Sequence, residues 1–463
     1  MATLFDPLRL GAIALDVMTV SHGTVQAMLD RQQARLKNMV VSAVRGSAFY
    51  RARLHDKIQG QWQLKDLPIV QKSDLMAHFD DWVTDPALRL EKIRIFLSES
   101  KNIAEPLLGK YLVWESSGSS HEPGIFLQDA QSMAVYDALE AFRCSRPRAL
   151  LRWLDPLFLT DRIAFVGAVD GHFSSYVSMQ RMRQTNPFMA RRMRCFSILQ
   201  PLDSLVDALN RFIPTVIATY PSVAAMLADA FKQGVLHCSP KELWLGGETL
   251  SAAVRSHLEE IFGCSVRNNY GASEFMAMGW ECAAGHLHAN TDWLILEPVD
   301  EQGKPVPEGQ QSYTTLLTHL ANRVQPLIRY DLGDQIMLQP GLCSCGSPLP
   351  VMDVAGRKDE VLTLQADNGV QVTLLPMALT TVLEEEAGVF DFQIEQTGTR
   401  SLLIRLPATV ADGLNISVRC ATVVKAFAAR LGLQSIKVEA QTVAALRRGA
   451  SGKAQRVLGP GTP

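Results

Sequence analysis

The chain has 463 residues, of which 47% are hydrophobic, and this is enough apolar material for a large core and more than one domain. Its 45 Lys and Arg residues are balanced by 47 Asp and Glu residues, and because the basic ones are mostly scattered we expect no nucleic-acid partner. Eight cysteines in so long a chain exclude a disulfide framework.

The N-terminal region shows no pattern of a secretion signal. The first twenty residues lack a basic start and are interrupted by Asp6, Arg9 and Asp16. No stretch of the chain reaches the roughly 18 uncharged apolar residues of a membrane span. We therefore expect a cytoplasmic protein without a membrane partner. A long helix is predicted at residues 22–45, ending near Gly46.

A loop rich in Ser and Gly follows an apolar strand predicted at residues 111–115. Hydroxyl groups and free backbone N–H groups in such a loop can bind phosphate oxygens. The Gly-Lys-Ser/Thr sequence of a Walker loop is absent, so a plain turn is the alternative. The candidate phosphate ligands are Ser116, Ser117, Gly118, Ser119 and Ser120.

Short apolar runs alternate with helical stretches between residues 163 and 219. His172 lies in a predicted loop, where it is either a functional polar group or a structural hydrogen-bonding residue. Residues 216–219 form a predicted buried strand, and a helix is predicted to begin just after Tyr220. Tyr220 is therefore expected at the carboxyl end of a strand.

Residues 243–274 follow the order strand, glycine turn, helix, strand, loop. The first strand stops at Gly246 and Gly247, which Glu248 follows, and the last loop runs from Tyr270 to Glu274. In a parallel α/β sheet, both loops lie at the carboxyl ends of strands, where ligands bind. Glycine lets backbone approach a ligand, a tyrosine ring can stack on one, and a carboxylate can hold a hydrated divalent cation. The stretch suits a nucleotide, and a tight turn with a packed loop is the alternative.

The pattern after Glu274 turns to β structure, with strands predicted at 293–299, 313–318 and 335–339. Together they predict a small antiparallel subdomain. Asp334 follows a glycine within it, and its carboxylate is either an acceptor for ribose hydroxyls or an ordinary turn residue.

Three of the cysteines form a candidate metal site. Cys282, Cys343 and Cys345, together with His286 or His288, supply the four ligands of a closed tetrahedral Zn²⁺ site. We prefer His288 because it lies nearer to the following predicted strand. A cluster of reduced thiols without metal is the alternative.

The last hundred or so residues alternate strands with helices, which are predicted at 376–386 and 416–431. This pattern predicts a second domain of α+β type. The chain closes with a basic segment in which Lys453 stands between a glycine and a short apolar run. A solvated tail is the alternative for that segment.

Taken together, these segments resemble the adenylate-forming superfamily, and within it the phenylacetate-CoA ligase branch, over nearly the whole chain. The resemblance rests on Ser-Ala-Phe-Tyr-Arg at 47–51, the Ser/Gly loop at 116–124, Gly-Gly-Glu at 246–248, Tyr-Gly-Ala-Ser-Glu at 270–274, Arg-Tyr-Asp-Leu-Gly-Asp at 329–334, Gly-Arg-Lys-Asp at 356–359 and Ser-Gly-Lys at 451–453. It implies an α/β fold: a large N-terminal domain of layered sheets with a small β subdomain, residues 1–357, and a smaller mobile α+β domain, residues 358–463.

The resemblance also implies a role for each motif. The implied cofactor-binding residues are Ser116 to Ser120 for the ATP phosphates, Gly247, Glu248 and Tyr270 around the adenine, and Asp334 with Arg357 at the ribose. Gly271 and Ser273 are also implied to bind the cofactor. The implied catalytic residues are Glu274, which would hold Mg²⁺, Asp359 at the hinge, and Lys453, which would neutralise charge between the carboxylate and the α-phosphate. The walls of the acid pocket are assigned to Phe173, Tyr176 and Tyr220.

The implied activity is the ATP-dependent ligation of a small carboxylic acid, expected to be aromatic, to CoA. An amine or a carrier-protein thiol is the alternative acceptor, and a homodimer is left open. The chain departs from the family at His121 and Glu122, where Gly and Lys are expected, and offers only Gly369 in the region after the hinge. A catalytically silent relative that binds a nucleotide or an acyl group is therefore a further hypothesis.

Overall fold

The structure, a computed structural model, describes residues 6–116, 123–143, 160–169, 171–374, 376–408, 414–448 and 453–459. Unit 1 comprises Met1–Thr160, Val169–Cys195 and Asn268–Val354, and unit 2 comprises Asp161–Ala168, Phe196–Arg267 and Ala355–Pro463. Both units contain helices and strands, which confirms the α/β class predicted from the sequence.

The helix α2 (Val25–Gly46) confirms the long helix predicted near the N-terminus of unit 1. Its N-cap is Thr24, whose hydroxyl accepts the backbone N–H three residues on. Apolar residues at helical spacing, among them Leu36 and Val40, turn one face into the core. The other helices in the described part of unit 1 are α1 (Pro7–Ser21), α3 (Ala48–Leu54), α4 (Lys72–Ala77), α5 (Phe79–Trp82), α6 (Leu90–Leu97), α7 (Ala130–Phe142), α9 (Ser174–Thr185) and α10 (Pro187–Arg192), with short turns η1 (Asp56–Ile58), η2 (Leu64–Asp66) and η3 (Ser100–Asn102).

Unit 1 also holds the β subdomain. Strand β10 (Leu294–Val299) pairs antiparallel with β11 (Thr314–His319), which pairs with β12 (Tyr330–Asp331). With β13 (Asp334–Leu338), these strands confirm the three that the sequence predicts there. The remaining strands of this region are β1 (Leu112–Glu115), β2 (Ile125–Gln128), β8 (Gly279–Glu281) and β9 (Leu287–Ala289), and β4 (Met193–Ser197), β7 (Ser265–Tyr270) and β14 (Met352–Arg357) begin in one unit and end in the other.

Unit 2 contains a parallel sheet of β3 (Ile163–Gly167), β5 (Val216–Thr219) and β6 (Glu242–Gly246). Helix α13 (Ala252–Phe262) follows β6 and ends at Gly263, where φ is +59°, a backbone conformation that glycine adopts without steric cost. The predicted order of strand, turn and helix is thus confirmed. The other helices beside this sheet are α11 (Leu202–Phe212) and α12 (Pro221–Lys232).

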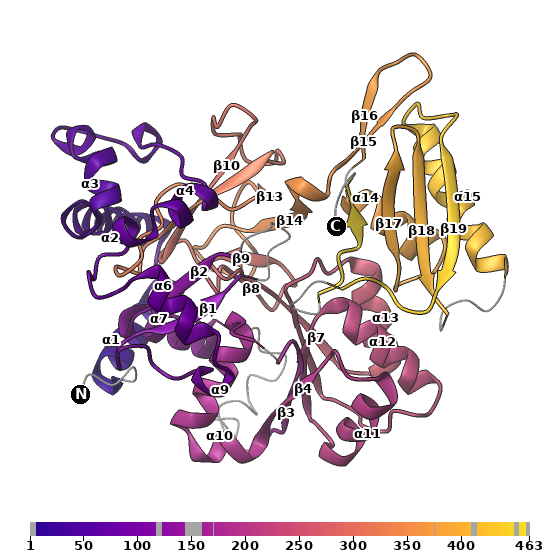
Figure 1. Ribbon diagram of the computed structural model, residues 1–463, viewed down its shortest axis with the longest axis horizontal. Helices are drawn as coiled ribbons and strands as arrows, with labels where there is room; N and C mark the ends of the chain where they lie inside the picture. The colour runs from indigo at the N-terminus through magenta and orange to yellow at the C-terminus, as the bar shows by residue number, and fades with distance from the viewer. Residues whose placement is uncertain are drawn as a thin grey trace. The chain divides into compact units, whose positions relative to one another are not determined.

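The C-terminal part of unit 2 has a hydrophobic core of its own, formed by residues between 362 and 457. It contains a four-stranded sheet in the order β19-β18-β17-β20, and helix α15 lies against β19 (Figure 1). The α+β content predicted for this region is present, while the domain boundary at residues 357 and 358 stays a prediction. The elements are η4 (Lys358–Glu360), β15 (Leu362–Gln365), β16 (Gln371–Leu374), α14 (Pro376–Thr381), η5 (Val382–Glu386), β17 (Gln393–Gly398), β18 (Ser401–Pro407), α15 (Leu414–Arg430), β19 (Lys437–Val443) and β20 (Val457–Leu458).

Across the residues that the structure describes, no helix combines the length and the apolar character that crossing a membrane requires. The cytoplasmic location expected from the sequence stays a prediction.

Candidate active site

The Ser/Gly loop begins and ends at two residues that are hydrogen-bonded to each other. The Ser116 N–H donates to the Gly124 carbonyl at 2.8 Å, and the Gly124 N–H donates to Ser116 Oγ at 2.8 Å. Because β1 and β2 pair antiparallel on either side, these bonds close the base of a hairpin. The predicted phosphate ligands Ser117, Gly118, Ser119 and Ser120 lie outside the described residues, and their role stays a prediction.

The loop at residues 270–274 turns sharply at Gly271. A Cβ atom at this position would lie 1.9 Å from the carbonyl oxygen of Met276, so only glycine fits. Two bonds then attach the loop to the end of β1: Trp114 Nε1 donates to the Ser273 carbonyl at 2.8 Å, and Ser273 Oγ donates to the Glu115 carbonyl at 3.4 Å. The loop is thereby held beside the start of the Ser/Gly loop.

Two carboxylates of the predicted nucleotide site each accept a hydrogen bond from a tyrosine. Tyr270 Oη donates to Asp334 Oδ2 at 2.6 Å, and Tyr330 Oη donates to Glu274 Oε1 at 2.9 Å. Both carboxylate residues are buried, and such bonds offset the cost of burying polar groups. The structure therefore brings Tyr270, Glu274 and Asp334 into one cluster. It adds Tyr330, which the sequence analysis did not single out although it lies within the 329–334 motif.

Two predicted residues of the acid pocket lie at the start of α9, next to β1. Phe173 is the N-cap of α9 and forms a parallel β-bridge with Glu115, whose N–H donates to the His172 carbonyl at 2.8 Å. The phenol oxygen of Tyr176, in the first turn of the helix, accepts from Gln180 Nε2 at 2.6 Å. Burial raises the pKa of the Glu115 carboxyl and lowers that of the His172 imidazole, so burial favours the neutral form of both.

Unit 2 gathers four of the predicted site residues: Gly247, Glu248, Tyr220 and Lys453. Gly247 has φ +78°, and a Cβ atom on it would lie 2.9 Å from Lys453 Cε and 3.2 Å from Tyr220 Cδ1. The Lys453 Nζ atom is 5.9 Å from the centre of the Tyr220 ring. Burial, aided by the nearby Glu248 charge, raises the pKa of Tyr220 to about 12, which keeps the phenol protonated at neutral pH.

Arg357 and Asp359 lie where β14 passes into the C-terminal part of unit 2. Arg357 is the last residue of β14 and is exposed, and Asp359 lies in the turn η4. The side chain of Asp359 is outside the described part of the structure. The ribose-binding role of Arg357 and the hinge role of Asp359 stay predictions.

Comparison with known proteins identifies the fold. No protein-family profile matches the chain. The chain is 27% identical over 136 residues to protein CapK of Staphylococcus aureus, and the match covers 29% of this chain and 29% of that protein. It is 28% identical over 173 residues to phenylacetate-coenzyme A ligase of Escherichia coli (strain K12), over 35% of this chain and 38% of that protein. The chain thus spans well under half the length of the curated relatives it matches.

A solved structure matches over a much larger share of the chain. Crystalline 2-hydroxyisobutyryl-CoA ligase in the postadenylation state, in complex with R3-HIB-AMP, has a TM-score of 0.69 and 20% identity, and the match covers 96% of this chain and 92% of that chain. The chain has the fold of the adenylate-forming CoA ligases. In this adenylate-forming fold, the site residues described above come from widely separated stretches of the sequence.

Within the adenylate-forming fold, unit 1 also assembles the predicted metal ligands. The ligand atoms of Cys282, His288, Cys343 and Cys345 all lie within 4.8 Å of one another. Cys282 Sγ and Cys343 Sγ are 3.8 Å apart, which is about the separation that two Zn–S bonds of ~2.3 Å give in a tetrahedron. Burial raises the pKa of the Cys343 thiol, but hydrogen bonds from the Cys345 N–H and from His286 outweigh it and lower that pKa to about 6.

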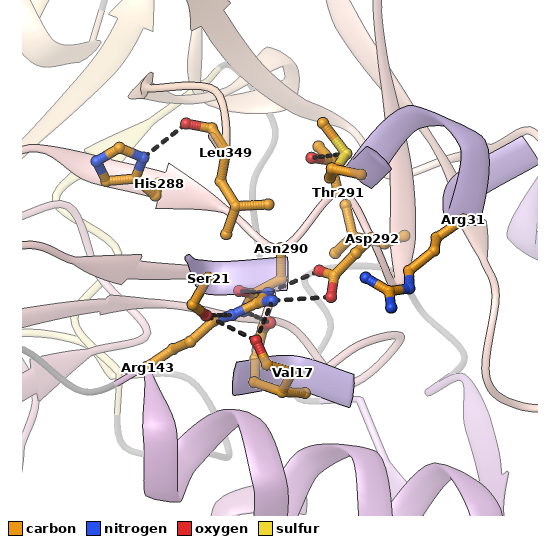
Figure 2. A network of polar contacts seen from close by, with 12 residues as sticks. Val17, Ser21, Arg31, Arg143, His288, Asn290, Thr291, Asp292 and Leu349 are labelled. Atoms are coloured by element: carbon orange, nitrogen blue, oxygen red, sulfur yellow. Dashed lines mark hydrogen bonds and ion pairs between the residues drawn. The ribbon is translucent and has the colours of Figure 1, made fainter. Parts of the chain in front are cut away.

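The orientation of His288 favours it over His286 as a ligand. The His288 Nδ1 atom lies 2.8 Å from the Leu349 carbonyl, to which a protonated Nδ1 donates (Figure 2). This bond turns Nε2 toward Cys345 Sγ, 3.4 Å away, which is the arrangement typical of a metal-bound histidine. His286 lies at the edge of the group, with Nδ1 3.2 Å from Cys343 Sγ.

A buried ion pair that the sequence analysis missed involves a residue shortly after His288 in the sequence. The guanidinium of Arg143, at the end of α7, donates to both carboxylate oxygens of Asp292, at 2.6 and 2.8 Å, and to Asn290 Oδ1 at 2.9 Å (Figure 2). It also donates to Ser21 Oγ at 3.2 Å, at the end of α1. Asn290 Nδ2 in turn donates to the Ala277 carbonyl at 2.7 Å, so the network supports the segment that follows Glu274.

Proposed function

We propose that the protein activates a carboxylic acid with ATP and then transfers the acyl group to CoA, releasing AMP and pyrophosphate. The observation that carries this proposal is the cluster of Tyr270, Glu274 and Asp334, in which the 270–274 loop is hydrogen-bonded to Asp334 at the start of β13 and to Tyr330. The similar proteins support it, since they include CoA ligases, one of them in complex with an acyl-AMP. We further infer that the acid is aromatic, with Phe173, Tyr176 and Tyr220 as pocket walls.

The chemistry explains why these groups would be needed. In the first step a carboxylate oxygen bonds to the α-phosphorus of ATP and the bond to the pyrophosphate oxygen breaks, so two anions must approach each other. The Glu274 carboxylate fits a Mg²⁺ ion, which when bound would neutralise phosphate charge. The ammonium group of Lys453 would supply a second positive charge at the contact point. In the second step the CoA thiolate attacks the acyl carbon, and AMP leaves.

We infer that the enzyme passes from the first step to the second by a rotation of the C-terminal domain, residues 358–463, about Asp359. The separate hydrophobic core of residues 362–457 supports this assignment, because a segment with its own core can move as a body. Such a motion would carry the Lys453 side chain away from the α-phosphate and make room for CoA, the second acceptor.

The test of the function is acid-dependent exchange of pyrophosphate with ATP over a panel of aromatic and aliphatic acids. We expect exchange with at least one aromatic acid, and thioester formation when CoA is added. Exchange without thioester, but with product on adding an amine or a carrier protein, would assign the acceptor differently. No exchange with any acid would favour the catalytically silent relative.

We also propose that Cys282, His288, Cys343 and Cys345 hold a structural Zn²⁺ ion. The support is the geometry of the four ligand atoms and the bond that orients His288. Such an ion would fix the segments around β8, β9 and residues 343–345 to one another, and it would take no part in the reaction. A homodimer and a cytoplasmic location remain predictions.

Metal analysis of the purified protein is expected to find about one zinc per chain. The Cys343→Ser variant should lose the metal and unfold at a lower temperature, because the site then lacks a ligand. Cys195→Ser, which changes a cysteine outside the cluster, is the matched control and should keep it. Equal metal content in the two variants would contradict the assignment.

A further inference from the structure

Glu248 joins two segments of unit 2 that are more than 200 residues apart in the sequence. Its Oε1 atom accepts from the Ala454 N–H at 2.7 Å and from Ser222 Oγ at 3.0 Å, and its Oε2 atom accepts from the Ser222 N–H at 3.0 Å. Ser222 is the second residue of α12, so its N–H has no acceptor within the helix. Ala454 directly follows Lys453.

Ala454 and the residues that follow it are hydrogen-bonded to different parts of unit 2. The residues after it are held by the C-terminal core: Gln393 Nε2 donates to the Gln455 carbonyl at 2.9 Å, and β20 pairs with β17. Arg456 is also attached to the C-terminal part of unit 2, through its ion pair with Glu384 at 2.5 Å. Ala454, in contrast, donates its N–H to the Gly-Gly-Glu turn after β6. Glu248 therefore acts on the backbone right beside Lys453.

The position of Lys453 depends on that attachment. A Cβ atom on Gly247 would lie 2.9 Å from the Lys453 Cε atom, so the lysine side chain passes close to this glycine. The Lys453 ammonium lies over the Tyr220 ring. Ala454 also forms a β-bridge with Arg448, and Arg448 Nη1 donates to Ser222 Oγ at 3.3 Å. The serine hydroxyl that bonds to Glu248 thus also accepts a hydrogen bond from Arg448, the residue that bridges to Ala454.

We propose that Glu248 is a latch, a positioning residue that holds the Lys453 segment in place for acyl-adenylate formation and releases it for acyl transfer. The proposal rests on the function proposed above for Lys453. A carboxylate suits the task because it offers only acceptors, and its three bonds here come from two N–H groups and one hydroxyl. Glutamine at this position would place an NH₂ group against one of those donors.

Limited proteolysis tests the latch without any substrate. Trypsin cuts after Lys and Arg, and the bond after Lys453 is the one whose N–H donates to Glu248, so the segment must detach before it is cut. We expect Glu248→Gln to speed cleavage at Lys453–Ala454 about tenfold, because a charge-assisted bond is lost. Ser222→Ala should act in the same direction and less strongly. Glu260→Gln, an exposed acid on α13, is the matched control and should leave the rate unchanged.

The bond after Lys425, within α15, serves as the internal reference for general unfolding. Faster cutting at Lys453 with unchanged cutting at Lys425 supports the latch. Equal acceleration at both bonds, or no acceleration at Lys453 in either Glu248→Gln or Ser222→Ala, overturns it.

Partial reactions separate the latch from a direct role in nucleotide binding. We expect Glu248→Gln to lower the kcat of pyrophosphate exchange about tenfold, to leave the KM for ATP unchanged, and to leave acyl transfer from a supplied acyl-adenylate intact. A raised KM for ATP with an unchanged cleavage rate would make Glu248 a wall of the adenine site instead. If the parent protein shows no exchange, the proposed function fails, and the proteolysis still decides whether Glu248 holds the segment.

Discussion

Replacing Lys453 with Ala is expected to slow acyl-adenylate formation by about 10²- to 10³-fold, which is the usual cost of removing one preorganised group that stabilises transition-state charge. Acyl transfer from a supplied acyl-adenylate should stay within about twofold of the parent rate, because in the second step the thiolate attacks the neutral acyl carbon and not the charged α-phosphate. Pyrophosphate exchange measures the first step, and thioester formation from synthetic acyl-adenylate and CoA measures the second.

Lys425→Ala is the control for Lys453→Ala. Lys425 is an exposed lysine of α15, so its removal changes the net charge of the same part of the chain without touching the Gly247 turn. Both partial reactions of this variant should match the parent. Equal loss of both steps in Lys453→Ala would point to a structural role for the lysine and would count against the electrostatic one.

Local sequence patterns predicted the elements that carry the site. The helix α13 was predictable from the spacing of Val254, Leu258 and Phe262 and from the glycine that ends it, and these signals act within a few residues. The turns at residues 246–248 and 270–274 were predictable for the same reason, because their glycines are local signals. The structure shows that Gly271 is required by the nearby Met276 carbonyl, a contact five residues away.

The partners of the site carboxylates could not be predicted in this way. The bond between Tyr330 and Glu274 joins residues 56 apart, and the pair of Arg143 and Asp292 joins residues 149 apart. Neither spacing produces a periodic signal, because the two partners meet only after separate elements have packed together. The cysteines were an exception, since Cys343 and Cys345 stand close enough in the sequence to suggest a shared ligand.

Asp292→Ala is expected to lower the free energy of unfolding by about 3–5 kcal/mol, because it leaves the guanidinium of Arg143 buried without its counter-ion. The carboxylate side chain of Asp292 is 0% exposed and that of Arg143 is 1% exposed, so water cannot replace the lost bonds without opening the core. Asp292→Asn should cost less, because the amide keeps one acceptor oxygen for the guanidinium. Urea unfolding followed by tryptophan fluorescence measures the differences. Asp56→Ala, at an exposed acid in η1, is the control and should change stability by less than about 0.5 kcal/mol.

A double-mutant cycle decides whether the effect belongs to the pair. If Arg143 and Asp292 stabilise unit 1 through each other, removing both should cost less than the sum of the two single losses, because no unpaired charge stays buried. The ion pair is also connected to the proposed site, because Asn290 accepts from Arg143 and donates to the Ala277 carbonyl. Breaking the pair should therefore loosen the segment that follows Glu274. Pyrophosphate exchange should then fall in Asp292→Ala even at temperatures where the variant is folded. Additive stability losses together with parental exchange would show that the network neither acts as a unit nor supports the site.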